Sequence, residues 1–217
     1  MYWMDLTYPE IEERLKQDPL VILPIGSTEE HGHHLPLSSD SLQAIYVAEK
    51  IAEKSNGLIL PPIYYGYTEL DDFKGTISVS FETLYNLVYD ILKEITDDGV
   101  KKILIISGHA SSLHMGAIRY AARKILEKKD VKIMVLSDYD IAYELRAKLV
   151  PENDSHAGII ETSRMLHIRE DLVKKNWIFE KKPDKKYMVT RNYREIYTYG
   201  TLSDPNGASK ELGEKID

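Results

Sequence analysis

Four short apolar runs, separated by segments with helical periodicity, constrain the fold of this chain more than any other feature of its sequence. The runs cover residues 20–25, 58–60, 101–106 and 131–136, of which the second is the weakest. Continuous apolar runs are typical of strands that a parallel sheet buries on both faces, whereas half-exposed strands alternate apolar and polar residues. We therefore predict buried parallel strands at these positions.

Amphipathic segments between the runs predict helices. Apolar residues recur with helical spacing in residues 42–51, 84–95, 118–126 and 141–149. The second segment lies between Ser80, which can cap a helix start, and Gly99, which suits a helix end. Buried strands that alternate with amphipathic helices predict an α/β fold with a largely parallel sheet, whose ligands bind at the carboxyl ends of the strands.

The C-terminal segment, residues 173–217, differs in composition from the rest of the chain. It has a charged turn at 181–186, followed by tyrosines among polar residues. We interpret it as a hairpin-like excursion or meander that closes over the sheet. A chain of 217 residues fits one domain, at roughly 100–200 residues per domain. We therefore expect residues 1–217 to form a single domain.

Composition excludes several classes of function. The chain has 28 Lys and Arg against 35 Asp and Glu, a net charge of −7, which disfavours nucleic-acid binding. It has no cysteine, so any metal must be held by histidines and carboxylates. No apolar run approaches the ~20 residues of a membrane span, and the acidic first turns are unlike a secretory signal. We expect a soluble, cytoplasmic protein that binds neither nucleic acid nor membrane.

Histidines and carboxylates follow two of the predicted strands. In an extended segment Glu29 and His31 point to the same side, so both could reach one ion or two adjacent ions. Asp40 follows nine residues later at a predicted helix start, where a carboxylate can bridge two metals, and His109 would complete the set. These ligands suit Zn, Mn or Fe and leave a coordination position open for water, as catalysis requires.

Each of these residues also has an ordinary structural explanation. Asp40 could cap the following helix, which is the commonest role of an aspartate there. His33 and His34 could be solvated loop residues, and we expect at least one of them to be. The adjacent glutamates at 29 and 30 could form a charged turn, and His109 could be a hydrogen-bonded core residue. Because metal-competent groups coincide at two strand ends and one helix start, we favour the metal site.

A third group, residues 155–163, offers further chemistry. His156 could shuttle protons and Glu161 could add a carboxylate, while the small residues between them admit a substrate. The alternative is a helix start with Gly158 as N-cap and Glu161 in its first turn. The residues alone leave both explanations open. The sequence signatures of serine hydrolases, P-loop proteins and dinucleotide-binding proteins do not occur.

Several motifs together point to one family. They are Gly26–Gly32 with His34–Leu37 and Asp40, Gly75–Ser78, Ser107–His109, His156–Gly158 with Glu161–Ser163, and Tyr199–Pro205 with Ala208–Gly213. These motifs resemble those of the creatininase (creatinine amidohydrolase) family of binuclear-metal amide hydrolases. The resemblance runs from about Pro24 to the last residue. It implies a three-layer α/β sandwich with a mostly parallel central sheet, and a homo-oligomer that is a hexamer or smaller.

The resemblance also implies roles for particular residues. Two divalent ions, Zn, Mn or Fe, are expected, with Asp40 bridging them. The implied metal ligands are Glu29, His31, Asp40 and His109. His156 is expected to be the catalytic acid or base, and Glu161 is expected to be a metal ligand or an orienting carboxylate of the catalytic site.

The chain departs from the family pattern in three places. Creatininase itself has a glutamate ligand two residues after the histidine, where this chain has Ser111. One metal therefore loses a carboxylate unless Glu161 or water replaces it. A histidine that often precedes the Gly-Thr motif is missing from the region around residues 70–72, and the sequence contains two tryptophans, Trp3 and Trp177. These departures argue against creatinine as the substrate.

We predict a metal-dependent hydrolase of a small or cyclic non-peptide amide, in which a metal-bridged hydroxide attacks the carbonyl carbon and His156 protonates the leaving nitrogen. Two enzymatic alternatives stay open: an archaeal-type formamide deformylase of flavin and deazaflavin synthesis, and a small-peptide amidase of the same family. A third alternative is a catalytically degenerate oligomer that binds metal and a small ligand, because residues 110–112 are altered.

Overall fold

The centre of the molecule is a sheet of four parallel strands in the order β2-β1-β3-β4. The structure is a computed structural model and describes residues 1–141, 145, 148–151, 153–180, 189–190 and 192–217. The strands are β1 (Leu20–Ile25), β2 (Leu58–Ile59), β3 (Lys102–Ser107) and β4 (Lys132–Ser137). Each coincides with one of the predicted apolar runs to within one residue at either end, which confirms the α/β prediction.

Strands β1, β3 and β4 run in step, so their carboxyl ends meet at one edge of the sheet. Ile25 at the end of β1 pairs with Ser107 at the end of β3, and Ser107 pairs with Ser137 at the end of β4. The loops that follow these residues therefore start at the same level. This alignment places the segments after β1 and β3 side by side.

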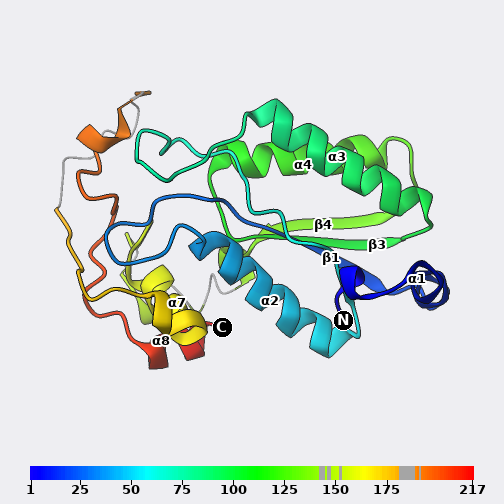
Figure 1. The fold of residues 1–217 in the computed structure, drawn as a ribbon, viewed down its shortest axis with the longest axis horizontal. Coiled ribbons are helices and arrows are strands. Elements are labelled where there is room, and N and C mark those ends of the chain that lie inside the picture. The colour runs from blue at the N-terminus through cyan, green and yellow to red at the C-terminus, as the bar shows by residue number, and fades with distance from the viewer. Residues whose placement is uncertain (142–144, 146–147, 152, 181–188, 191) are drawn as a thin grey trace.

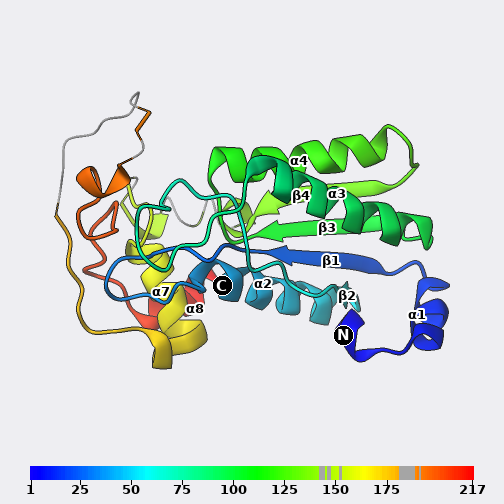
Figure 2. The ribbon, with the colours of Figure 1, turned by 45° about the horizontal axis from the view of Figure 1, so that its top comes forward.

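Helices cover both faces of the sheet and make three layers (Figures 1 and 2). Helices α3 (Phe81–Asp97) and α4 (Ser112–Leu126) pack on one face, and α2 (Ser39–Ser55) packs on the other. Consecutive strand residues point to opposite faces, so Val21 contributes to the first apolar cluster and Ile22 to the second. The three-layer sandwich is confirmed.

The remaining helices of the described residues are short or lie near the carboxyl edge of the sheet. They are η1 (Trp3–Asp5), α1 (Tyr8–Leu15), α5 (Asp138–Ile141), α7 (Ile159–Arg169), η2 (Glu170–Leu172), η3 (Tyr193–Glu195) and α8 (Lys210–Ile216). Most of the helix predicted for residues 141–149 falls outside the described residues.

Local capping explains where the main helices begin. Ser80 caps α3 as predicted, because its side chain accepts a hydrogen bond from the backbone N–H of Thr83 at 3.1 Å. The N-cap of α2 is Ser38, and Asp40 lies inside the first turn. The capping explanation for Asp40 is therefore wrong, and its carboxylate is available for the site.

The described part of residues 173–217 contains no strand, so it does not form the predicted hairpin or meander. It ends instead in α8, which packs so closely on α7 that a Cβ at Gly213 would lie 2.1 Å from the backbone oxygen of Ser163. The seven residues of α8 are too few to show helical periodicity in the sequence. The charged turn at 181–186 lies outside the described residues.

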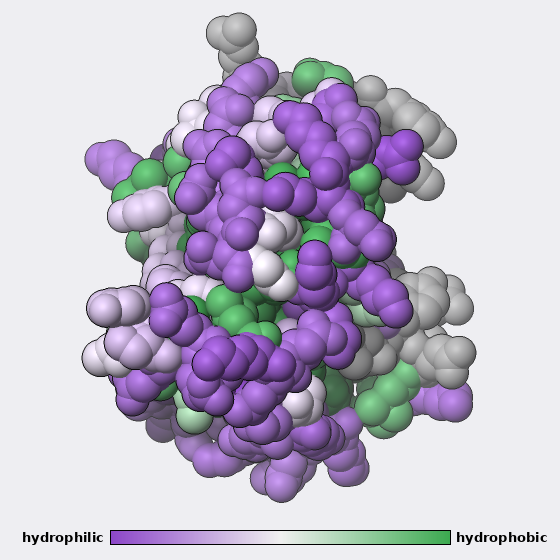
Figure 3. Space-filling model, turned by 90° about the vertical axis from the view of Figure 1, so that its right-hand side faces the viewer, coloured by the Kyte–Doolittle hydropathy of each residue, from purple (hydrophilic) through white to green (hydrophobic). Residues whose placement is uncertain are grey.

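The end of the molecule that carries α1 lies opposite the carboxyl edge of the sheet (Figure 1). Its surface is mostly hydrophilic, with hydrophobic side chains gathered near the middle of the view (Figure 3). In the part of the chain that the structure describes, no helix is both long and apolar enough to cross a membrane.

Candidate metal centre

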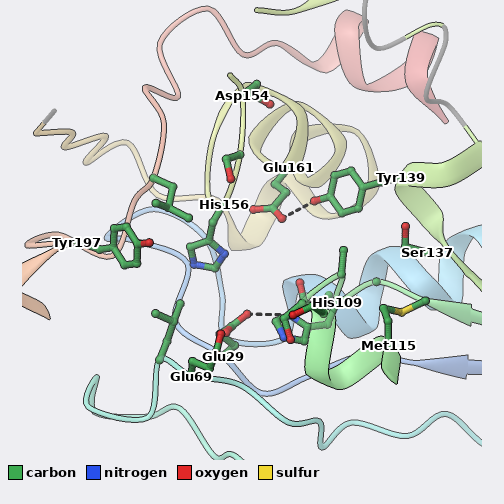
Figure 4. A pocket seen from close by; sticks show the side chains of 18 of the residues that line it. Glu29, Glu69, His109, Met115, Ser137, Tyr139, Asp154, His156, Glu161 and Tyr197 are labelled. Carbon is green, nitrogen blue, oxygen red and sulfur yellow. Dashed lines mark hydrogen bonds and ion pairs between the residues drawn. The ribbon is translucent and has the colours of Figure 1, made fainter. Parts of the chain in front are cut away.

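The predicted site residues converge at the carboxyl edge of the sheet. Glu29 and His31 lie in the loop after β1, Asp40 lies in the first turn of α2, and His109 follows β3. The start of α7 brings Glu161 to the same place, with His156 just before it. In Figure 4, His156 and Glu161 lie on one side of the pocket, and Glu29 and His109 lie on the other.

Asp40 stands between the two histidines of this cluster. Its Oδ1 lies 3.0 Å from His31 Nε2, and its Oδ2 lies 3.2 Å from His109 Nδ1. Glu29 Oε2 lies 3.1 Å from His109 Nδ1, and Glu161 Oε2 lies 3.8 Å from His31 Nε2. The two oxygens of Asp40 thus face two different groups of side chains.

The described residues contain three compact sets of possible metal ligands. Two of them share Asp40: Glu29, Asp40 and His109, and His31, Asp40 and Glu161. The third is Glu29, His31 and the partly buried His156. Within each set the ligand atoms lie within 4.8 Å of one another. The side chains of the two sets that share Asp40 are all buried; the exposed fraction of Asp40 is 1%. Three buried carboxylates this close together require compensating positive charge, and their oxygen and nitrogen atoms suit Zn, Mn or Fe.

The neighbouring histidines lower the pKa values of Asp40 and Glu29 and favour their ionised forms. Burial raises the pKa of Asp40, but the charges and hydrogen bonds of His31 and His109 outweigh burial and hold that pKa well below its usual range. Burial likewise opposes the ionised form of Glu29, yet His109 lowers its pKa to about 2. The site therefore presents anionic oxygens, which a divalent cation can neutralise.

Hydrogen bonds from neighbouring groups orient the carboxylates. Ser27 Oγ donates to Asp40 Oδ2 at 2.6 Å, and the Thr68 hydroxyl donates to Glu29 Oε1. The Tyr139 hydroxyl donates to Glu161 Oε1. Partners of this kind fix ligand orientation at metal sites.

Glu161 is held from its other side by an unusual turn. The backbone N–H of Ala157 donates to Glu161 Oε2 at 2.5 Å. Ala157 is buried and has a left-handed backbone with φ +54°, a strained conformation for a residue other than glycine. Gly158 is the N-cap of α7, so residues 155–163 are both a helix start and part of the site.

His156 has a partner that the sequence did not reveal. Its Nε2 lies 2.9 Å from the backbone oxygen of Glu30 and 3.3 Å from Glu30 Oε1. Burial and the nearby His31 lower the pKa of His156, but the hydrogen bond to Glu30 and the charges of Glu29 and Glu161 outweigh them and raise it. The side chain of Glu30 is buried and does not form the charged turn considered above.

The two other histidines of the first motif lie outside the ligand sets. His33 is exposed, which confirms that at least one of the pair is solvated. His34 is fully buried, and its Nε2 lies 2.9 Å from Thr162 Oγ1. Its position supports the packing of the loop after β1 against α7.

Ser111 has a structural role. It is the N-cap of α4, and its side chain accepts a hydrogen bond from the backbone N–H of His114. The carboxylate that accompanies His31 and Asp40 comes from Glu161. The structure thus supplies a third carboxylate although position 111 has none.

A pocket of about 650 Å³ opens over the cluster. Several of its lining residues come from parts of the chain that the sequence analysis did not assign to a site. They are Glu69, Leu70, Arg119, Tyr139, Tyr193, Tyr197 and Leu202. The volume is typical of a pocket for a small organic ligand.

The protein is a parallel three-layer α/β sandwich with a buried cluster of carboxylates and histidines at its carboxyl edge that could hold metal ions. The profile of the creatininase family, described as creatinine amidohydrolase, matches residues 4–216. The chain therefore belongs to the creatininase family.

Curated relatives differ in what they act on. The chain is 30% identical to the creatinine amidohydrolase of Pseudomonas putida, over 98% of this chain and 90% of that protein. It is 29% identical to the mycofactocin precursor peptide peptidase of Mycolicibacterium smegmatis, over 91% of this chain and 79% of that protein. The family thus includes an amidohydrolase and an enzyme that acts on a peptide.

Solved creatininase structures share the fold. A creatininase in a manganese form superposes with a TM-score of 0.86 at 30% identity, covering 99% of this chain and 92% of that one. A mutant creatininase of Zn-Zn type gives a TM-score of 0.85 at the same identity and the same coverage.

Proposed function

We propose that the protein is a metal-dependent amidohydrolase that cleaves the C–N bond of a small or cyclic amide. Asp40 carries the proposal, because each of its oxygens faces a different histidine at hydrogen-bond distance. Both of its oxygens would therefore be available as metal ligands. Membership of the creatininase family supports the reaction class.

The donor set fits two divalent ions, Zn, Mn or Fe. Glu29, Asp40 and His109 would hold one ion, and His31, Asp40 and Glu161 would hold the other. When bound, such ions supply an activated water near neutral pH and polarise the carbonyl oxygen of the amide.

His156 is the proposed acid and base. Its Nε2 carries a proton, because the backbone oxygen of Glu30 can only accept a hydrogen bond. Nδ1 is then the ring nitrogen that exchanges a proton with the substrate and protonates the leaving nitrogen. The raised pKa of His156 favours the protonated ring that this step requires.

The backbone around His156 is fixed by neighbouring residues and by one distant segment of the chain. Asp154 accepts hydrogen bonds from the backbone N–H of Ile159 at 2.8 Å and of Ile160 at 3.0 Å. The backbone N–H of Leu202 donates to the carbonyl oxygen of His156 at 3.0 Å. This anchoring holds the imidazole beside the cluster, as efficient proton transfer requires.

Metal content and turnover measured together test the proposal. Metal per chain is measured by mass spectrometry on protein purified without chelator, for the wild type, Asp40→Ala and His156→Ala. We expect two ions in the wild type, loss of metal in Asp40→Ala, and full metal without turnover in His156→Ala. An Asp40→Ala protein that keeps both metal and activity would contradict the proposal.

A substrate panel separates the alternatives within the same experiment. It contains cyclic amides such as creatinine, formamides and short peptides, so it covers the deformylase and small-peptide amidase alternatives. Hydrolysis of any of them excludes the catalytically degenerate binding protein. Light scattering on the same sample tests the proposed homo-oligomer.

A further inference from the structure

We propose that Arg119 binds an oxyanion of the substrate, a carboxylate or a phosphate, so that the hydrolysed amide carries a negative charge. The inference rests on the proposed function and deepens it, because it names the class of amide that the same pocket takes.

Arg119 differs in charge from the other charged residues that line the pocket. Among the lining residues that the structure describes, it is the one with a permanently positive side chain. The acidic lining residues are Glu29, Asp40, Glu69, Asp140, Asp154 and Glu161. Among these lining side chains, Arg119 is therefore the one that can attract an anionic group by a permanent charge of its own.

Most of the acidic lining residues already accept hydrogen bonds from other groups of the protein. Those of the metal cluster accept the hydrogen bonds described above, Asp154 accepts from the start of α7, and Asp140 Oδ2 accepts from the backbone N–H of Ser137 at 2.9 Å. Glu69 is exposed at the rim. Arg119 is exposed as well, and it has no carboxylate or hydrogen-bond partner in the described ranges.

Two other basic side chains, Arg164 on α7 and Lys124 on α4, contrast with Arg119 because each has an acidic partner. Arg164, on α7, is buried between Asp138 and Asp217, with ion-pair distances of 2.5 and 2.6 Å. Lys124, farther along α4, pairs with Glu127 at 3.0 Å. Arg119 therefore keeps its N–H donors for a ligand, and their planar fork matches the two oxygens of a carboxylate or phosphate.

The position of Arg119 on α4 sets where the anion would lie. Ser111, Ser112, Met115 and Arg119 all line the pocket, and their spacing places them on one helical face. From Ser112, where the helix begins, to Arg119 the helix rises about 10 Å at 1.5 Å per residue. Side chains on a helix lean towards its amino end, which here follows His109.

The neighbours of Arg119 on this wall of the pocket are uncharged serine and methionine side chains. An anion bound here is therefore separated from the buried carboxylates by neutral surface. The expected substrate has its scissile amide near His109 and its anionic group roughly one to two helical turns, about 5–10 Å, away along α4. A neutral ring as small as creatinine does not use this part of the pocket.

Three matched probes, whose anionic group can lie about 6 Å from the amide, test the inference by titration calorimetry. They are 4-acetamidobutyrate, its neutral amide 4-acetamidobutyramide, and 3-acetamidopropylphosphonate. The wild-type holoenzyme should bind the two anionic probes about tenfold to a hundredfold more tightly than the neutral one, as charge-assisted hydrogen bonds allow. The carboxylate and phosphonate arms then show which oxyanion the pocket prefers.

Arginine variants test whether Arg119 causes the preference for anionic over neutral probes. Arg119→Ala should abolish it and Arg119→Glu should reverse it. Arg123→Ala is the matched control, because Arg123 is exposed on the same helix and does not belong to the pocket lining. A wild type without charge preference, or an Arg119→Ala protein that keeps it, would overturn the inference.

Hydrolysis of the same probes separates this inference from the proposed function. Hydrolysis with no dependence on probe charge or on Arg119 supports the amidohydrolase and overturns the anion site. Charge preference that depends on Arg119, with no hydrolysis of these or other amides, supports the anion site and contradicts the amidohydrolase.

Discussion

The imidazole of His156 and the carboxylate of Glu30 lie 3.3 Å apart, with Nε2 facing Oε1. Glu30 is itself held on its other oxygen, because the backbone N–H of Gly32 donates to Oε2 at 2.9 Å. Gly200 packs against the same carboxylate, and a Cβ there would lie 1.7 Å from Oε2. The Glu30 side chain therefore has little freedom and orients the His156 ring, whose tautomer the backbone oxygen of Glu30 fixes.

Replacing Glu30 tests this positioning role. Glu30→Ala should lower kcat by about tenfold to a hundredfold, because the ring of His156 loses an orienting partner. KM and metal content should change little, since Glu30 belongs to none of the ligand sets. Glu30→Gln should recover much of the loss because its amide oxygen still accepts from Nε2. Equal kcat values for the wild type and the alanine variant would refute the assignment.

Glu161 and Ser111 give contrasting predictions for metal binding. Glu161→Gln should reduce bound metal from two ions to about one per chain, because His31 and Asp40 lose their anionic partner. Ser111→Ala should keep the metal and lower stability by about 1 kcal/mol, since the side chain caps α4. Metal analysis and urea denaturation of both variants measure these effects. Metal loss in Ser111→Ala would instead make the serine part of the site.

Sequence patterns revealed the fold and the metal cluster because both depend on regular structure. Apolar runs marked the strands, and a parallel sheet places strand ends at one edge, which brings Glu29 and His109 together from separate segments. The cap of α3 was visible because Ser80 and Gly99 bracket a long periodic segment. These features follow from local chemistry and one topological rule.

The rest of the site depends on contacts that no local pattern reports. Glu30 lies in an irregular loop, where the direction of a side chain has no period. Its partner His156 is 126 residues away, and Arg164 meets Asp217 across 53 residues. Tyr139 reaches Glu161 from a different helix. Only the folded chain shows these pairs.

Stability should fall in mild acid because of His34. Burial, and secondarily the nearby His31, lower the pKa of His34 from 6.5 to about 4. The unfolded chain takes up a proton as the pH falls below 6.5, whereas the folded chain does so only near 4. The stabilisation is therefore complete above pH 6.5 and is lost as the pH falls from 6.5 towards 4.

Urea denaturation at several values between about pH 7 and pH 4 measures this dependence. His34→Gln should flatten the slope of the unfolding free energy against pH. His33→Gln provides the control, because it removes an imidazole from an exposed position of the same loop. An unchanged slope in His34→Gln would show that other groups cause the acid sensitivity.

Two glycines of the same region predict opposite changes in stability. A Cβ at Gly108 would lie 1.9 Å from the backbone oxygen of Asp40, and neither group can rotate away. Gly108→Ala should therefore destabilise the fold by about 1–3 kcal/mol and lower metal content, because it forces Asp40 away from His109. Gly116→Ala, inside α4, should stabilise the fold by about 0.5–1 kcal/mol, since its Cβ meets Phe81 at an ordinary 3.7 Å. Urea denaturation and metal analysis of the two variants compare these effects, and a Gly108→Ala protein with wild-type stability and metal content would show that this contact does not position Asp40.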